Sequence, residues 1–142
     1  MRIFFHFVKA AAVTAVSAAC ALFACVLRSA PAFEGGEHYE FYLGASSAAL
    51  ILPSENPARD KLLLGGTAGE SVRYEGDRWE ELKMRYRAEV LFTEEAGGVT
   101  NYYCYSPCFT KSVWIGGYFV NFHVAVSAER TAAGTPLVFG GF

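Results

Sequence analysis

The segment KSVWIGGYFVNFHVAVS, residues 111–127, decides the fold of this chain because it specifies a β-hairpin. Two adjacent glycines stand alone between two runs of β-branched and aromatic residues, which is the pattern of a two-residue hairpin turn. The pattern predicts strands at 111–115 and 118–127. The turn at Gly116-Gly117 then sets the register, with Ile115 opposite Tyr118 and Val113 opposite Val120.

The long strand at 118–127 has two different faces, because successive side chains of a strand point to opposite sides. One face is apolar and predicts core packing; it consists of Tyr118, Val120, Phe122, Val124 and Val126. The other face is mixed in polarity, and the register of the turn places Trp114 of the preceding strand on this face as well. The candidate binding residues on this face are Trp114, Phe119, Asn121 and His123. We expect this face either to lie under a second layer or to open to a ligand.

The sequence before this hairpin predicts a helix followed by a second hairpin. Asp77, with Glu80 three residues later, gives a capping-box-like start to the helix. One face of the helix is apolar and is interpreted as core; it consists of Trp79, Leu82 and Tyr86. Strands at 88–93 and 99–105 then flank a loop, 94–98, that ends in two glycines.

The remaining segments give shorter strand patterns and one open choice. Strands are expected at 39–43, 48–52, 71–75 and 137–139. Segment 57–64 follows a potential N-cap at Asn56, begins with proline and precedes a glycine, which favours a short helix. Its three consecutive leucines fit a buried strand equally well, so both interpretations stay open. The pattern as a whole predicts one α+β domain over 39–142, in which a strand-helix unit precedes an antiparallel β-meander and the helix packs on one sheet face.

Two strings near the C-terminus carry a resemblance to a known family. They are Val120-Asn121-Phe122-His123-Val124-Ala125-Val126 and Gly134-Thr135-Pro136-Leu137-Val138. Both resemble the tail of the exported YwmB-like proteins of Gram-positive bacteria, which have a TATA-binding-protein-like fold. The resemblance covers the last third of the chain beyond residue 32, and this chain is shorter than the family members. It implies half of that fold, and it implies neither catalytic residues nor DNA binding.

The first 32 residues predict an export signal. A basic region around Arg2 and Lys9, an apolar run at 10–27 and the small residues of Ala30-Pro31-Ala32 occur in the order that signal peptides require. Cleavage after Ala32 would make Phe33 the first residue and leave 33–38 as a linker. The alternative is an uncleaved membrane anchor, because 18 apolar residues lie at the lower limit for crossing a bilayer.

Removal of residues 1–32 would make the remaining chain acidic. This segment contains three of the 12 basic residues and none of the 14 acidic ones, which leaves nine against 14, a net charge of −5. A negative domain is poorly suited to bind the phosphates of nucleic acid or an anionic membrane surface. We therefore expect an exported envelope or extracellular domain that has no nucleic-acid partner and that contacts a membrane only through its N-terminal segment.

Cysteine and histidine side chains are the main candidates for chemistry beyond residue 32. Cys104 and Cys108 are expected to form a local disulfide in an oxidising compartment, or else to remain two free thiols. A zinc site needs three or four ligands, and no second Cys/His pair stands at ligand spacing, so no metal site is expected.

Two function classes follow from these residues. The first, which we favour, is a non-enzymatic module without a cofactor that binds a protein or a cell-envelope component through its aromatic face. The second is a small thiol-dependent enzyme or redox protein in which His123 activates the thiol of Cys104 or Cys108. No family signature surrounds these residues, and this favours the binding module.

Overall fold

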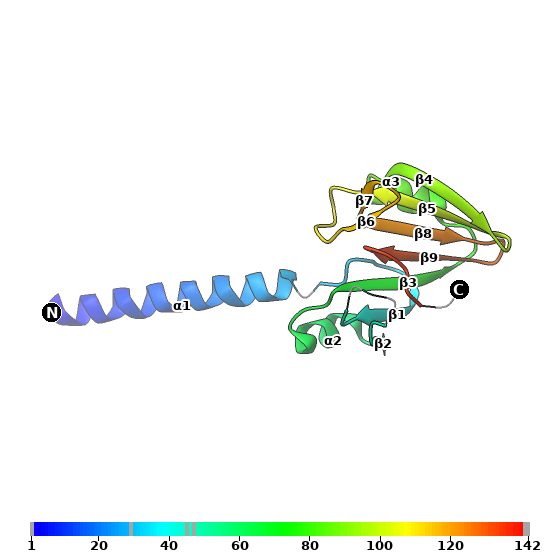
Figure 1. Ribbon diagram of the computed structural model, residues 1–142. Helices are drawn as coiled ribbons and strands as arrows, with labels where there is room; N and C mark the ends of the chain where they lie inside the picture. The colour runs from blue at the N-terminus through cyan, green and yellow to red at the C-terminus, as the bar shows by residue number, and fades with distance from the viewer. Residues whose placement is uncertain (1, 29, 45, 47, 141–142) are drawn as a thin grey trace.

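The computed structural model describes residues 2–28, 30–44, 46 and 48–140 (Figure 1). One long helix, α1 (Arg2–Arg28), extends away from an α+β domain. Within it, Val8–Leu27 is a stretch of 20 residues that is long and apolar enough to cross a membrane, and the domain buries none of it. The helix is therefore compatible with the predicted signal peptide and with the predicted anchor.

Seven strands form one antiparallel sheet in the order β2-β1-β3-β9-β8-β5-β4, which confirms the predicted α+β class (Figure 1). Two short helices, α2 (Pro57–Leu64) and α3 (Trp79–Arg85), accompany the sheet. The strands of the sheet are β1 (Glu37–Tyr42), β2 (Ile51–Ser54), β3 (Gly69–Glu75), β4 (Glu89–Ala96), β5 (Val99–Tyr105), β8 (Phe122–Val126) and β9 (Arg130–Thr135). A separate two-stranded sheet consists of β6 (Val113–Ile115) and β7 (Tyr118–Val120).

Helix α3 packs across one face of the sheet through the residues that the sequence predicted. Trp79, Leu82 and Tyr86 are all buried. The indole of Trp79 stacks on the ring of Tyr102 in β5, with ring centroids 3.8 Å apart. The face below them is lined by buried side chains of the central strands, from Ala133 to Phe122 in size, so the core lies between α3 and this face of the sheet.

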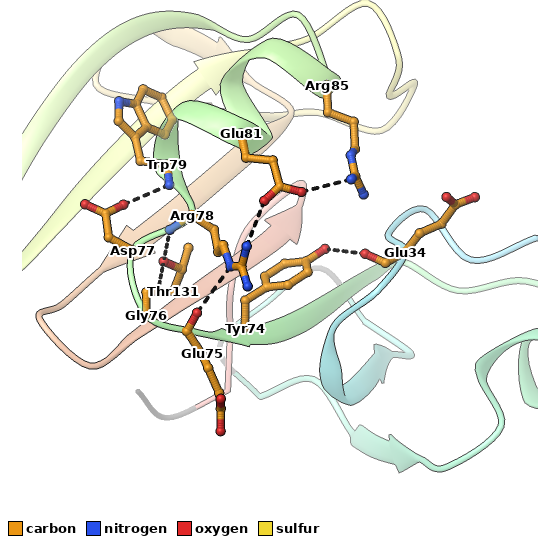
Figure 2. Close-up of polar contacts among 10 residues, drawn as sticks. All are labelled: Glu34, Tyr74, Glu75, Gly76, Asp77, Arg78, Trp79, Glu81, Arg85 and Thr131. Carbon is orange, nitrogen blue, oxygen red and sulfur yellow. Dashed lines mark hydrogen bonds and ion pairs between the residues drawn. The ribbon is translucent and has the colours of Figure 1, made fainter.

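The start of α3 differs from the predicted capping box (Figure 2). The carboxylate of Asp77 accepts the backbone N–H of Trp79 at 2.9 Å. The hydroxyl of Thr131 in β9 accepts the N–H of Arg78 at 2.9 Å and donates to the carbonyl of Gly76 at 2.7 Å. The start of the helix is therefore bound by Thr131, 53 positions from Arg78 in sequence, where the pattern predicted the nearby Glu80.

The open choice at 57–64 is resolved as a helix. Asn56 accepts the N–H of Arg59 at 3.3 Å, and Gly65 ends α2 in the left-handed conformation with φ +66°. Strand β2 differs from the expected strand at 48–52, because it begins at Ile51 and continues through Pro53 to Ser54. Because β2 is an edge strand, the missing N–H of the proline costs no ladder hydrogen bond.

The predicted final strand at 137–139 is wrong, and the closing strand is β9. Its inner residues Ala132, Ala133 and Gly134 have low β-propensity, but they are buried between β3 and β8, where small side chains fit. The apolar tail instead crosses the sheet face opposite α3. There the N–H of Phe139 donates to the hydroxyl of Tyr42 at 3.1 Å.

The predicted linker at 33–38 is part of the folded domain. Phe33 is only 1% exposed and belongs to the core. Its ring centroid lies 5.5 Å from those of Tyr86 and Phe109 and 6.1 Å from that of Phe122. The chain is therefore packed from Phe33 onward, and β1 already begins at Glu37.

The junction between α1 and the domain is held by a partly buried ion pair. Lys61 Nζ lies 2.5 Å from Glu70 Oε1, and it also donates to the carbonyl of Ala30 at 2.7 Å. Glu70 Oε2 accepts the N–H of Ala32 at 3.0 Å. The residues of the predicted cleavage site are thus bound to α2 and β3.

Candidate functional site

The hairpin β6–β7 has the register that its glycines predict. Gly116 and Gly117 adopt φ of +60° and +88°, a conformation that fits the two-residue turns of β-hairpins. The cross-strand pairs are Val113 with Val120, Trp114 with Phe119 and Ile115 with Tyr118. The alternation of a strand therefore places Trp114 and Phe119 on one face of the hairpin.

The two faces of this hairpin differ in exposure. On the inner face, Val120 is fully buried, and Tyr118 is 46% exposed while its ring lies against Phe92 of β4 with centroids 5.8 Å apart. On the outer face, Trp114 is 63% exposed and Phe119 is 64% exposed. Their rings meet edge to face with centroids 4.6 Å apart. We call this pair the outer aromatic pair.

The predicted strand 118–127 is broken at Asn121, which lies between β7 and β8. Asn121 Oδ1 accepts the N–H of Ser106 at 2.6 Å. Its Nδ2 donates to the carbonyls of Ser106 at 2.7 Å and Phe109 at 2.8 Å. The side chain is buried with both polar atoms engaged, so it fastens the loop after β5 and is not open to a ligand.

His123 is also buried, on the sheet face opposite α3. Its ring stacks on Tyr103 with centroids 4.5 Å apart, and Tyr103 stacks on Phe92 at 4.4 Å. Nδ1 accepts the N–H of Val138 in the C-terminal tail at 3.2 Å. Nε2 lies 3.1 Å from Asn101 Oδ1, and it carries the ring proton because Nδ1 is already an acceptor. At His123 this face therefore lies under a second layer, which is the C-terminal tail.

The environment of His123 keeps its imidazole neutral. Burial removes water from the charged form and lowers the pKa of His123 to about 4. Of the four candidate binding residues, only Trp114 and Phe119 are open to solvent. Asn121 and His123 hold neighbouring segments in place, and the break at Asn121 puts His123 in a different sheet from the outer aromatic pair.

The two cysteines of the domain are free thiols, and the predicted disulfide between them is not formed. Cys104 in β5 points into the core, where burial raises its pKa to about 12. Cys108 is exposed in the following turn, with its N–H bound to the hydroxyl of Ser106 at 3.1 Å and its sulfur 4.0 Å from Arg87 Nη2. The buried serine between the two cysteines keeps their side chains in different environments.

The sheet also separates Cys104 from His123. Cys104 pairs with Phe122, and the neighbouring pair is Tyr103 with His123. Adjacent residues of a strand point to opposite faces, so the Cys104 thiol lies in the core and the His123 imidazole lies on the other side. Among the described residues, no three His, Cys, Asp or Glu side chains gather in a way that fits a metal ion.

Two features of this region were missed by sequence reasoning. Tyr118 and Phe92, which seat the hairpin, lie in separate hairpins and nothing local joins them. A cleft of about 1010 Å³ next to α1 was missed as well, and its lining includes Leu27, Lys61 and Lys111. The sequence signal nearest to this cleft is the Leu62-Leu63-Leu64 run of α2, of which Leu62 lines it.

No protein-family model matches this chain, and no curated protein or solved structure is similar to it, so the resemblance of its C-terminal part to YwmB-like proteins stays a prediction.

Proposed function

We propose that this protein is an exported, non-enzymatic binding module, held at a membrane by α1, that recognises a protein or a cell-envelope component through the outer aromatic pair. The observation that carries the proposal is the exposure of Trp114 and Phe119, nearly two thirds each, on a hairpin that Val120 and the contact of Tyr118 with Phe92 attach to the rest of the domain. Aromatic side chains of this kind are enriched among the residues that dominate binding energy at interfaces.

The hairpin is suited to recognition because it is organised before any partner arrives. The turn glycines, the contact of Tyr118 with Phe92 and the edge-to-face packing of the outer aromatic pair restrict the side chains in the free protein. If a partner covered both rings, burial of their apolar surface would contribute about 1.5–3 kcal/mol of binding free energy per fully covered side chain. Little of this gain would be lost to ordering the hairpin.

Retention of α1 is supported by the junction of the helix with the domain. Cleavage after Ala32 would remove the N–H that Glu70 binds and the carbonyl that Lys61 binds. It would also place a new charged amino group on Phe33, whose side chain is in the core. The folded domain therefore favours the uncleaved chain over the processed one.

The non-enzymatic part of the proposal is supported by the state of Cys104 and His123, two of the three groups that would do chemistry. A thiol with a pKa of about 12 is protonated at neutral pH, and a thiol is nucleophilic as the thiolate. The imidazole that was expected to activate it lies across the sheet and has both nitrogens engaged.

The recognition surface is tested by photo-crosslinking in cells. A photoreactive phenylalanine analogue replaces Trp114 in the full chain, and the control carries it at Glu95, an exposed site in β4. We expect a discrete adduct from position 114 that Phe119→Ala weakens, and no such adduct from position 95. Equal labelling from the two positions, or no adduct from position 114, would reject the outer aromatic pair as the recognition surface.

The tether is tested by the mass and the location of the protein. We expect the intact mass to include residues 1–32 and the protein to stay with membranes after extraction at high pH. Glu70→Gln, which removes the charge partner of Lys61, is expected to expose the junction and increase cleavage after Ala32. A wild-type protein that starts at Phe33 and is free of membranes would refute the tether.

A further inference from the structure

Helix α2 carries an apolar surface that the described part of the domain leaves uncovered. None of its residues is buried, and Leu62 and Leu63 are 52% and 71% exposed. An isolated helix of eight residues has little stability of its own in water. Its exposed leucines form an apolar patch at this end of the helix.

The end of α2 lies beside the end of α1. The cleft of about 1010 Å³ at this place is lined by Cys25 and Leu27 of α1 and by Leu62 and Gly65 at the end of α2. In addition, Lys61 of α2 holds the carbonyl of Ala30 at 2.7 Å. The ends of the two helices therefore line one cleft, and a hydrogen bond joins α2 to Ala30.

The chain length sets how far α2 can lie from a bilayer that α1 crosses. Only three residue steps separate Leu27, where the apolar stretch ends, from Ala30, and these span at most about 11 Å when fully extended. The headgroup layer of one leaflet is roughly 5–7 Å thick. The leucines of α2, which follow Lys61 directly, are therefore within reach of that layer.

The charges around the cleft favour a lipid surface of negative charge. Its lining contains the cations Lys61, Arg85 and Lys111 and the carboxylate of Glu70, which is paired with Lys61. Arg85 also bonds to Glu81 at 2.9 Å. The domain has a net charge of −5 beyond residue 32, but at this end the cations outnumber the carboxylates that line the cleft.

We propose that Leu62 and Leu63 rest in the headgroup layer of the bilayer that α1 crosses, with Arg85 and Lys111 facing anionic lipid. The domain would then sit on the membrane in one orientation. This inference rests on the proposed retention of α1, and it adds a second membrane contact made by the domain itself.

The contact is tested with the full chain in nanodiscs that contain brominated phosphatidylcholine, which quenches tryptophan at the depth of the bilayer. Leu63→Trp and the control Glu95→Trp are both made in a Trp114→Phe background, so that the buried Trp79 is the only other indole. We expect quenching of Leu63→Trp to exceed that of the control at least two-fold. Adding about 30% phosphatidylglycerol is expected to increase it further.

Four outcomes would overturn the inference or a part of it in distinguishable ways. Equal quenching of the two variants, with α1 still protected by the bilayer from protease, rejects the contact and leaves the tether intact. Equal quenching together with crosslinked dimers through position 63 assigns the leucines to a second copy of the chain. Failure of the chain to enter nanodiscs rejects the tether itself. Quenching that ignores phosphatidylglycerol rejects the role given to Arg85 and Lys111.

Discussion

Acid should destabilise this domain through His123, and the size of the effect follows from the surroundings of the ring. The pKa of His123 is about 4 in the folded protein because of burial, against 6.5 for a histidine in water. One pKa unit corresponds to 1.36 kcal/mol. The shift therefore costs about 3 kcal/mol of folding free energy once the pH is below the folded value, and no discount for solvent is needed because the residue is only 7% exposed.

The sign of the pH effect follows from which state of the chain, folded or unfolded, binds the proton. Above about pH 6.5 the ring is neutral in both states and contributes nothing to the pH dependence. Between that pH and about 4 the unfolded chain binds a proton that the folded chain rejects, so the free energy of unfolding falls as the pH falls. A protonated Nδ1 would also face the N–H of Val138 that it now accepts.

The measurement is urea denaturation of the full chain in detergent, in steps from pH 7 to pH 4, for the wild type and His123→Gln. The difference between the two curves isolates His123 from the carboxylates, which titrate in both proteins. His38→Gln is the control for the loss of a histidine at an exposed site. Parallel curves for wild type and His123→Gln would refute the reasoning.

Three further predictions concern packing and reactivity. Trp79→Ala should destabilise the domain by about 3 kcal/mol or more, as for a large core aromatic, whereas Trp114→Ala should leave the melting temperature within a degree or two. Gly134→Ala should detach the C-terminal tail, seen as faster hydrogen exchange there, because an added Cβ would lie 2.5 Å from a backbone oxygen of the tail. Cys108 should react with a thiol reagent in the native protein and Cys104 only after unfolding; fast modification of both would contradict the burial of Cys104.

The parts of the fold that could be predicted from sequence are those fixed by neighbours along the chain. The Gly116-Gly117 turn determines its own register, because positive φ at both positions is a local requirement. The spacing of Trp79, Leu82 and Tyr86 likewise predicts, without any distant partner, that the three side chains share one face of a helix.

The parts that failed depend on partners far away in sequence. The strand break at Asn121 is stabilised by Ser106 and Phe109, and nothing near Asn121 signals them. The strand at Arg130–Thr135 was missed because its small residues are favoured only between β3 and β8. Phe33 was placed in a linker since a single aromatic residue has no periodicity, and its core position comes from contacts with distant rings.

The same dependence limits what could be said of the candidate site. Trp114 and Phe119 could be placed on one face of the hairpin from the turn alone. Whether that face is open depends on what Tyr118 meets, which is Phe92 of another hairpin. Asn121 and His123 were assigned to the same surface because the strand was taken as continuous.

The placement of β6–β7 also bears on how this protein can diversify. Strands β5 and β8 pair directly, from Thr100 with Val126 to Cys104 with Phe122, so the aromatic hairpin is an insertion within one ladder of the main sheet. Asn121 closes the base of the insertion through its bonds to Ser106 and Phe109. Replacing the exposed part of the inserted segment by another of different shape would leave the seven-stranded framework unchanged. The exposed tip of this loop, around Trp114 and Phe119, is thus a place where the domain can evolve or be engineered while the buried Val120 and the partly buried Phe109 are kept.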